Sequence, residues 1–386
     1  MRLLIVFPSI ERGGAEGYAL TMAHAALRAG WKVDVASPPG EGVRELLREF
    51  KQAGAGWHPL RIGRAATIFG RRPRPLVPIV AFLHSLRTLR RLRPEVILIV
   101  LPGPAACFPT QLAAALLGLP AVCCFQLTPV APWQPSALRR RCAAWARARG
   151  QRWVCVSGHN RDYVSLAFRV DPGSLTVIPN GATFAAPSTD RAAARAVVSE
   201  RLGLPGNARI ILTVARLGVQ KAHSVLLEAI PPIVAQHPDA HFVWLGEGEQ
   251  RAVLSARVAA LGLTRHVHLP GFQHDIPDWL LATDLFAFPT HYEGLPFSLV
   301  EAMAAGLPVA ASRVSSIPEI LDNGESGVLV DNTAEAWTAA INALLADDAL
   351  CETLGTHARL RAGDFTEAAM TRDTVALLEA CAKGNA

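Results

Sequence analysis

Short apolar runs alternate with longer amphipathic stretches along the first half of the chain. Runs at residues 2–7, 31–37, 96–101, 121–125, 152–156 and 175–178 predict strands, and the stretches 15–30 and 108–118 predict helices between them. Strands that alternate with helices in this way indicate βαβ units and a mainly parallel sheet. Such a sheet needs helices on both of its faces.

The second half of the chain repeats this pattern. Apolar runs at residues 208–216, 241–246, 266–271, 285–290, 308–312 and 327–330 predict a second parallel sheet, and the segment 178–190 is linker-like because it combines Pro, Asn-Gly and small residues. We therefore expect an α/β fold of two Rossmann-like domains, residues 1–183 and 184–364, that face each other across a cleft. A final helix is expected within residues 365–386.

The composition excludes several classes of protein. With 51% hydrophobic and 18% charged residues, the chain of 386 residues is neither disordered nor short of core material. Residues 96–138 carry no charge, but seven prolines interrupt them, so no membrane-spanning helix is expected. Seven cysteines without a CxxC pair indicate free thiols in a reducing compartment, and the N-terminus lacks the features of a secretory signal. We expect a cytoplasmic protein.

The net charge of +6 hides a strong asymmetry between the two halves. Residues 1–183 hold 24 Lys and Arg against 9 Asp and Glu, whereas the remainder holds 14 against 23. The arginines concentrate at 61–93 and 139–152, with Trp133, Trp145 and Trp153 close to the second group. A solvated basic face is one interpretation. The other is a surface that meets anionic lipid or an anionic, lipid-linked acceptor, which would place the protein on the inner face of a membrane.

The strongest chemical motif follows the strand predicted at 285–290. Glu293 stands at a turn with Gly294, and Glu301 follows seven intervening residues later, in a helix that is expected to start near Pro296. Both carboxylates can face one cleft, and the amides at the start of that helix favour an anion. Ser298 adds a hydroxyl group. A capped helix with solvated acids is the alternative, although the apolar sequence around Glu301 argues against it.

Two further motifs lie where predicted strands end. Arg216 and Lys221 flank a glycine turn after the strand 208–216, and two cations at that spacing suit a diphosphate, although exposed cations near helix starts are common. Gly13 and Gly14 follow the first strand and allow a ligand to approach the backbone. Neither the GxGxxG fingerprint nor a Walker P-loop is present. The turn at 246–248 is interpreted as structural.

Taken together, these motifs resemble one family. The segments VARLGVQKAHSVLLEA, LGEGE, GFQHDIPDWL, EGLPFSLVEAMAAGLPV and IPEILDNGESGVLV, preceded by IPNG, are similar to those of the retaining glycosyltransferases of family four. The similarity is dense over residues 178–330 and looser over the first half, where the glycine turn is the main match. The resemblance implies the two-domain GT-B fold, with the C-terminal helix crossing back onto the first domain.

The resemblance also implies roles for individual residues. Arg216 and Lys221 would bind the diphosphate of a UDP- or GDP-sugar, Glu301 the ribose hydroxyls, and Glu293 the donor sugar. The backbone amide of Gly14 would approach the donor from the first domain. The base would be bordered by Phe272 and His274. The remaining donor-binding residues would be Gly294, Leu295, Pro296, Phe297 and Ser298. His291 is expected to be a surface residue. No nucleic acid is expected as a partner, because the resemblance offers no motif that reads one.

The expected chemistry uses no metal and no cofactor besides the donor substrate. The chain has no Asp-x-Asp motif, and Arg216, Lys221 and the helix amides can stabilise the departing nucleoside diphosphate. One departure from the family concerns Gln126, which stands where relatives often carry a histidine and is expected to position the donor through hydrogen bonds. A hydrolysing or epimerising enzyme of nucleotide-sugars, a non-catalytic subunit and a transferase with a soluble acceptor are the alternatives.

Overall fold

The computed structural model describes residues 1–9, 13–62, 77–129, 133–183 and 188–384. It divides the chain into two compact units, one made of Met1–Asn180 with Glu367–Ala386 and the other of Gly181–Thr366. The expected boundaries at 183 and 364 fall within a few residues of these. In the second unit the chain enters and leaves side by side, because the amide of Ala182 donates to the Phe365 carbonyl over 3.0 Å.

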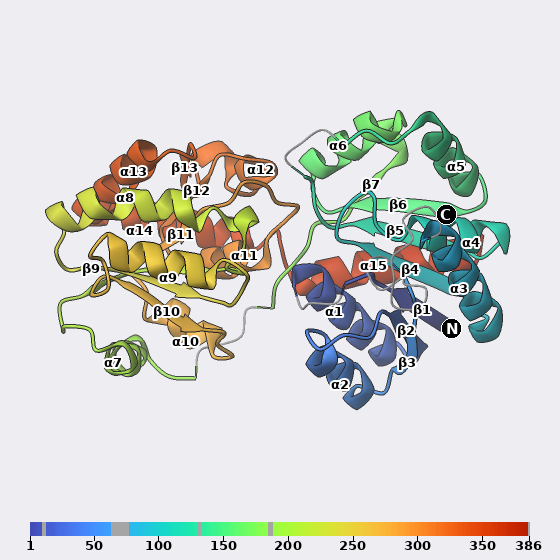
Figure 1. Cartoon of the computed structure of the whole chain (residues 1–386), viewed down its shortest axis with the longest axis horizontal. Helices are drawn as coiled ribbons and strands as arrows, with labels where there is room; N and C mark the ends of the chain where they lie inside the picture. Colours follow the sequence, from blue (N-terminus) through green and yellow to red (C-terminus); the bar gives the residue numbers. More distant parts are fainter. Residues whose placement is uncertain (10–12, 63–76, 130–132, 184–187, 385–386) are drawn as a thin grey trace. The chain divides into compact units, whose positions relative to one another are not determined.

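The first unit is built on a seven-stranded parallel sheet in the order β3-β2-β1-β4-β5-β6-β7 (Figure 1). Its strands are β1 Arg2–Val6, β2 Lys32–Ser37, β3 Gly56–Pro59, β4 Val96–Leu101, β5 Ala121–Phe125, β6 Gln151–Cys155 and β7 Thr176–Val177. Its helices are α1 Gly14–Arg28, α2 Arg44–Gln52, α3 Val77–Leu92, α4 Phe108–Leu116, α5 Ala137–Arg147, α6 Gly158–Phe168 and α15 Glu367–Ala382. The strands predicted for this half are confirmed.

One strand of this sheet was not predicted. The edge strand β3 contains Gly56 and Pro59 and has no apolar alternation, so its sequence carries no strand signal. It forms because its backbone pairs with β2 and because the His58 ring lies 2.8 Å from the Asp34 carboxylate. Tertiary contacts, rather than local propensity, decide this element.

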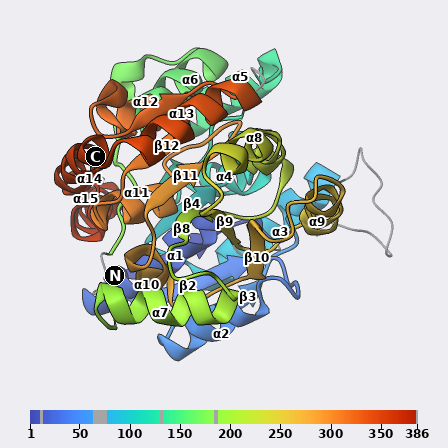
Figure 2. The ribbon, with the colours of Figure 1, turned by 90° about the vertical axis from the view of Figure 1, so that its left-hand side faces the viewer.

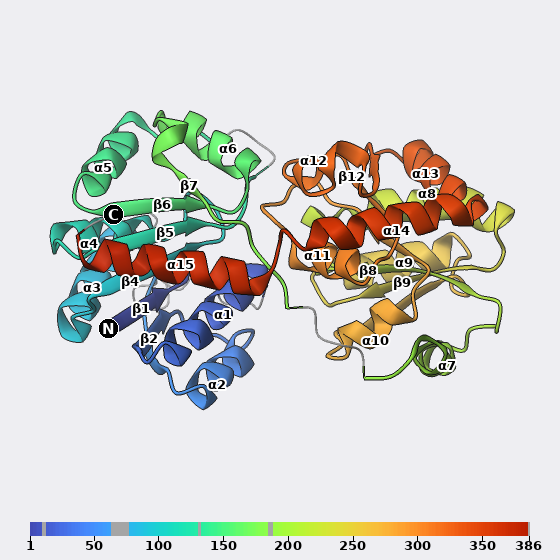
Figure 3. The same ribbon diagram turned by 180° about the vertical axis from the view of Figure 1, so that it is seen from behind.

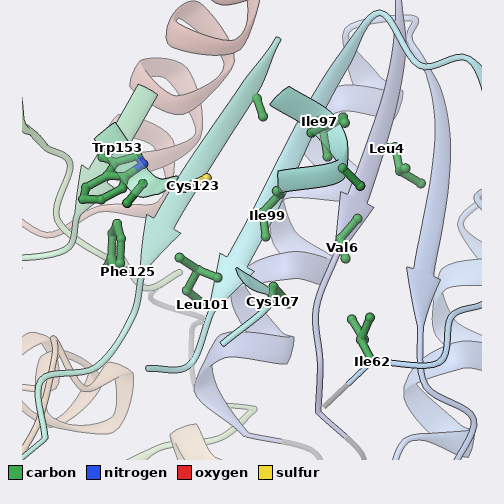
Figure 4. Packing of buried hydrophobic residues seen from close by; sticks show 14 of the residues in the cluster. Leu4, Val6, Ile62, Ile97, Ile99, Leu101, Cys107, Cys123, Phe125 and Trp153 are labelled. Carbon is green, nitrogen blue, oxygen red and sulfur yellow. The ribbon is translucent and has the colours of Figure 1, made fainter. Parts of the chain in front are cut away.

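Strand side chains alternate between two helical layers. Leu4, Val6, Ile97, Ile99 and Leu101 belong to one packed cluster with Cys123, Phe125 and Trp153 (Figure 4). This cluster also takes in residues of α3, α4, α5 and α6. On the other face α15 lies across β4 and β5 (Figure 3), and its Thr374 hydroxyl lies 3.4 Å from the Tyr18 hydroxyl of α1. The expected return of the last helix to the first domain is therefore confirmed.

The second unit holds a six-stranded parallel sheet in the order β10-β9-β8-β11-β12-β13. The strands are β8 Arg209–Val214, β9 Ala240–Leu245, β10 Val267–Gly271, β11 Leu285–Phe288, β12 Val309–Ser312 and β13 Val328–Val330. The helices are α7 Arg191–Leu202, α8 His223–Gln236, α9 Arg251–Ala260, α10 Ile276–Leu281, α11 Phe297–Ala304, α12 Ile317–Ile320, α13 Ala334–Ala346 and α14 Asp348–Ala362. Figure 2 looks onto this unit, in which α13 packs along α8.

All seven cysteines lie within the described residues. All seven cysteines are free, and neighbouring Cys123 and Cys124 lie on one strand. Burial raises the pKa of the Cys124 thiol to about 11, so this thiol is inert at neutral pH. Among the described residues, no helix combines the length and the apolar character that crossing a membrane requires.

Candidate functional site

Lys221 and Glu293 form an ion pair at the carboxyl edge of the second sheet. Lys221 closes a short 3₁₀ turn, Val219–Lys221, after β8, and Glu293 lies in the loop after β11. Because β8 and β11 are neighbours, the two loops meet, and the lysine Nζ lies 2.5 Å from Glu293 Oε1. The side chains are 15% and 5% exposed, so the pair is largely removed from water. A buried pair of this kind needs further hydrogen bonds to hold its geometry.

Those hydrogen bonds tie the two loops into one unit. The Thr290 hydroxyl donates to the same Glu293 oxygen over 2.8 Å. The Gln220 side-chain amide donates to the Tyr292 carbonyl over 2.8 Å, and the His291 amide donates to the Gln220 carbonyl over 2.8 Å. His291 is half-buried and contributes to this connection through its backbone. These bonds couple the two loops to each other.

A second network fixes Thr290 against the next two strands. The Thr290 amide donates to Ser312 Oγ over 2.8 Å, the Ser312 hydroxyl donates to Asn332 Oδ1 over 2.7 Å, and Asn332 Nδ2 donates back to the Thr290 carbonyl over 2.7 Å. Ser312 ends β12 and Asn332 follows β13. The closed ring of three bonds anchors the Glu293 loop to the sheet.

His223 lies two residues after Lys221 and is buried at the start of α8. Its ring meets Trp244 edge to face at 5.1 Å between centroids. Burial, with a smaller contribution from the charge of Lys221, lowers the pKa of His223 to about 3. His223 therefore stays neutral at physiological pH and adds no second positive charge beside Lys221.

Arg216 lies in a loop that two glycines hold in place. A Cβ on Gly246, whose φ is +142°, or on Gly248 would overlap the carbonyl oxygen of Ala215 or of Leu217. The backbones touch directly, since the Leu217 amide donates to the Glu247 carbonyl over 2.9 Å. The guanidinium of Arg216 is exposed and lies 3.1 Å from the Glu249 carboxylate. These two glycines therefore have a definite structural function, the positioning of the arginine loop.

Helix α11 carries Glu301 and begins four residues after Glu293. Pro296 is its N-cap, and no side chain caps the helix. The amides of its first turn, including those of Phe297 and half-buried Ser298, therefore have no intrahelical partner and suit an anion. Gly294, Leu295 and Pro296 before it are buried.

Glu301 occupies an apolar setting between Val300 and Ala302, and both of these neighbours are fully buried. Burial raises the pKa of the Glu301 carboxyl above its usual value of 4.5. A donor hydroxyl that binds the ionised form would lower that pKa again, so binding and protonation compete.

We expect nucleotide affinity to fall as the pH drops through the raised pKa of Glu301. If Glu301 accepts hydrogen bonds from the ribose hydroxyls, as the resemblance implies, the protonated acid would bind them less well and the dissociation constant would rise on the acid side. Titration calorimetry with the nucleoside diphosphate between pH 5 and 8 measures this. Glu301→Gln should weaken binding at pH 8 and flatten the pH profile. An unchanged profile in that variant would contradict the assignment.

Phe272 and His274 lie directly after β10. Phe272 is 56% exposed, and its ring meets that of His274 edge to face at 4.8 Å. Strands β10, β9, β8 and β11 are consecutive, so about 14 Å separate the ends of β10 and β11 at the usual strand spacing. The strands that Phe272 and Lys221 follow are closer than this, because Lys221 follows β8, which is two strands from β10.

Two predicted residues belong to the first unit. Gly14 is exposed and begins α1, whose N-cap Gly13 provides no capping side chain. Gln126 follows β5 and is buried, and its amide is held on both sides. Gln126 Nε2 donates to Cys124 Sγ over 3.1 Å, and Asn180 Nδ2 donates to Gln126 Oε1 over 2.9 Å. These two bonds hold the side chain in one orientation.

Four residues that position Glu293 are not among the site residues expected from the sequence. They are Gln220, Thr290, Ser312 and Asn332. Each is a polar residue at or just beyond the carboxyl end of a strand, or in the turn that follows one, and this position is the signal that could have found them. Their partners became visible only once strand order was known.

Two protein-family models match this chain, and their boundaries agree with its division into two units. A family model described as "Glycosyl transferases group 1" matches residues 195–361, and one described as "Glycosyltransferase Family 4" matches residues 12–184. Both descriptions are of glycosyltransferases, and each match lies mainly in one of the two units. The glycosyltransferase part of the resemblance is thereby confirmed, with the Lys221–Glu293 pair in the group 1 domain.

Curated relatives match the chain over part of their length. A D-inositol 3-phosphate glycosyltransferase of Thermobispora bispora is 34% identical over 199 residues, which are 48% of this chain and 46% of the relative. A UDP-Gal:alpha-D-GlcNAc-diphosphoundecaprenol alpha-1,3-galactosyltransferase of Escherichia coli is 30% identical over 200 residues, half of each chain. The chain thus spans about half the length of the curated relatives it matches.

Solved structures match over the whole chain. A glycosyltransferase from Rickettsia africae superposes with a TM-score of 0.81 at 18% identity, covering 98% of both chains. HepE of Anabaena, solved in complex with UDP and glucose, gives a TM-score of 0.77 at 19% identity and covers 98% of this chain and 100% of HepE. The GT-B fold expected from the sequence is confirmed.

Proposed function

We propose that this protein transfers a sugar from a nucleoside diphosphate sugar, with UDP or GDP as the nucleotide, to a hydroxyl acceptor, and that it retains the anomeric configuration. The observation that carries the proposal is the buried Lys221–Glu293 pair, whose glutamate lies in the loop that leads directly into α11, a helix without a capping side chain. A cation and free helix amides suit a diphosphate, while a fixed carboxylate suits the hydroxyls of a sugar. The relatives described above, and HepE with its bound UDP and glucose, support the substrate class.

In the proposed reaction the acceptor oxygen attacks the anomeric carbon from the face on which the leaving phosphate departs. The bond between that carbon and the phosphate oxygen breaks, and the new glycosidic bond forms. The acceptor proton passes to the departing phosphate oxygen, so the products are the glycoside and the nucleoside diphosphate. Lys221, Arg216 and the α11 amides stabilise the charge that develops on the phosphate, and Glu293 orients the sugar.

Product analysis tests this reaction. Proton NMR of the glycoside should show the anomeric configuration of the donor, and an inverted product would overturn the retaining mechanism. A preceding thermal-shift screen of nucleoside diphosphates and their sugars identifies the donor, since a bound ligand raises the melting temperature. Release of free nucleoside diphosphate at the same rate with and without acceptors would instead indicate a hydrolysing or epimerising enzyme. Tight binding without any turnover would indicate a non-catalytic subunit.

We expect full activity in the presence of EDTA. The proposed phosphate ligands are Arg216, Lys221 and backbone amides, and the chain lacks the Asp-x-Asp spacing of a metal-dependent site. Initial rates measured with 5 mM EDTA and with added Mg²⁺ or Mn²⁺ should agree within about twofold. Loss of turnover in EDTA that either metal restores would show that a cation carries part of the phosphate charge.

The proposed acceptor is lipid-linked, and the proposed location is the inner face of the cytoplasmic membrane. The support is the basic first unit and the printed activity of the E. coli relative, whose acceptor is carried on diphosphoundecaprenol. A soluble small-molecule acceptor is the alternative. Turnover on short-chain hydroxyl acceptors at the rate found with lipid-linked ones would favour it.

A further inference from the structure

Helices α3, α4 and α5 lie side by side on one face of the first unit (Figures 1 and 3). They enclose a groove of about 490 Å³, whose lining includes Phe82, Leu112, Leu116, Leu138, Arg141 and Trp145. The lining is almost wholly apolar, and the groove opens outward from the unit. The three helices bury their opposite sides in the cluster that contains Ala81, Ala113 and Ala143.

Large apolar side chains on the same three helices are exposed at helical spacing, some of them in the lining of the groove and others outside it. Ile79 and Leu83 lie one turn apart on α3, and Leu138 and Trp145 lie two turns apart on α5, with Leu116 at the end of α4. These five side chains are between 38% and 71% exposed. Single exposed apolar residues are ordinary, but a contiguous group on neighbouring helices marks an interaction surface.

Arginines continue the same helical faces. Arg87 and Arg90 extend the stripe of Ile79 and Leu83 along α3, and Arg141 lies between Leu138 and Trp145. Arg149 stacks over the Trp145 ring at 4.8 Å. Among the residues that the structure describes, none of these four arginines is paired with a carboxylate.

Acidic residues are almost absent from this part of the chain. Between Glu49 and Asp162, Glu95 is the only acidic residue. The resulting positive potential acts on His84 of α3, whose pKa is lowered by burial and further by the charges of Arg61, Arg87 and Arg91. The surface therefore combines exposed apolar side chains with uncompensated positive charge.

We propose that this helical face docks onto a bilayer of anionic phospholipid, with an acyl chain in the groove and the arginines at the headgroup phosphates. The inference rests on the proposed function in one respect: docking would give the enzyme access to a lipid-linked acceptor. Docking itself requires no turnover and can be measured separately. Exposed Trp145 with Arg149 on its ring suits the headgroup level of a membrane.

The positive charge of this surface favours an anionic bilayer over a second copy of the chain as its partner. A twofold-symmetric dimer through the groove would place the arginines of one copy against those of the other, without acidic residues to compensate them. An anionic bilayer supplies the opposite charge as well as an apolar interior. Each arginine near such a surface strengthens binding about fivefold at moderate salt.

Two of the three tryptophans expected near this surface are not exposed. Trp153 is 2% exposed and packs edge to face on Phe125 and Phe168, so it belongs to the core. Trp133 is half-buried against Phe168. Only Trp145 of the three is exposed. Arg64, Arg71, Arg72 and Arg74, part of the expected basic group, lie outside the described residues.

Co-sedimentation with vesicles tests the proposal on the full chain. Vesicles of phosphatidylglycerol and phosphatidylcholine are compared with vesicles of pure phosphatidylcholine, at 50, 150 and 500 mM NaCl. We expect binding to the anionic vesicles that weakens steeply with salt, since the Debye length shortens from about 14 to about 4 Å over this range.

Paired variants locate the surface. Arg141→Ser with Arg149→Ser should weaken binding about thirtyfold, and Leu138→Ser with Leu83→Ser about tenfold or more. Arg265→Ser and Leu360→Ser are the matched controls, because both residues are exposed on the second unit, and they should bind as the parent chain does. Thermal unfolding and the melting-temperature shift with nucleoside diphosphate, measured on each variant, show that the chain is folded and test the donor site separately.

Three outcomes would overturn the proposal. They are no binding to anionic vesicles at 50 mM NaCl, equal binding to neutral vesicles, and groove variants that bind like the controls. A concentration-dependent dimer that Leu138→Ser abolishes would assign the groove to a second copy. Because nucleotide binding is measured on the same proteins, failure of the docking surface and failure of the proposed function give different results.

Discussion

Replacement of Lys221 by alanine is expected to lower kcat by about 10²–10³-fold, the effect of removing one preorganised donor that stabilises a developing negative charge. The same change should lower stability by about 3 kcal/mol, because Glu293 would remain buried without its cation. Steady-state rates with the identified donor and chemical denaturation of the same preparations give the two numbers. From the sequence alone, this substitution is expected to lower turnover more than stability. The buried ion pair in the structure adds the loss of stability.

A double variant separates these contributions. Lys221→Met with Glu293→Gln removes both charges and keeps similar side-chain volumes, and the Thr290 hydroxyl can still donate to the amide oxygen. We expect stability to recover to within about 1 kcal/mol of the parent chain while kcat stays low. Recovery of kcat together with stability would show that Lys221 acts only through the fold.

Arg216→Ala is the matched comparison for Lys221→Ala. Its guanidinium is exposed and paired with exposed Glu249, so its removal leaves no buried charge. We expect a comparable loss in kcat with a change in stability below about 1 kcal/mol.

Gly246→Ala is expected to have the second large effect. The new Cβ would overlap the Ala215 carbonyl oxygen, and the φ of +142° at this position is unfavourable for any residue with a side chain. Relief requires β9 and the Arg216 loop to separate. We expect a loss of about 3 kcal/mol in stability and a nucleotide affinity at least tenfold weaker, measured by denaturation and calorimetry.

Gly206→Ala is the control for this change. Gly206 belongs to the same unit, has no left-handed φ, and a Cβ there would meet no atom within 4 Å. Its replacement should leave stability within about 0.5 kcal/mol of the parent chain. If Gly246→Ala behaved in the same way, the close backbone contact between the two loops would not hold Arg216 in place.

The sequence by itself determined every strand except β3, both parallel sheets and the candidate residues that follow the strands. The reason is that buried parallel strands are continuous apolar runs, and ligand-binding residues follow them at the carboxyl ends. Lys221, Glu293, Arg216 and Glu301 could be selected on this basis, because loops after apolar strands rarely need charged residues for packing alone. Strand β3 was missed because Gly56 and Pro59 give it no local signal.

Only the tertiary structure decided which of these residues meet. The pairing of Lys221 with Glu293, 72 positions apart, depends on β11 lying beside β8, and the bracing by Ser312 and Asn332 depends on β12 and β13 following in the same sheet. The order of parallel strands is set by helix packing across whole domains and not by local pattern. For the same reason the sequence could place Trp153 beside the basic surface, whereas packing against Phe125 and Phe168 put it in the core and left Trp145 exposed.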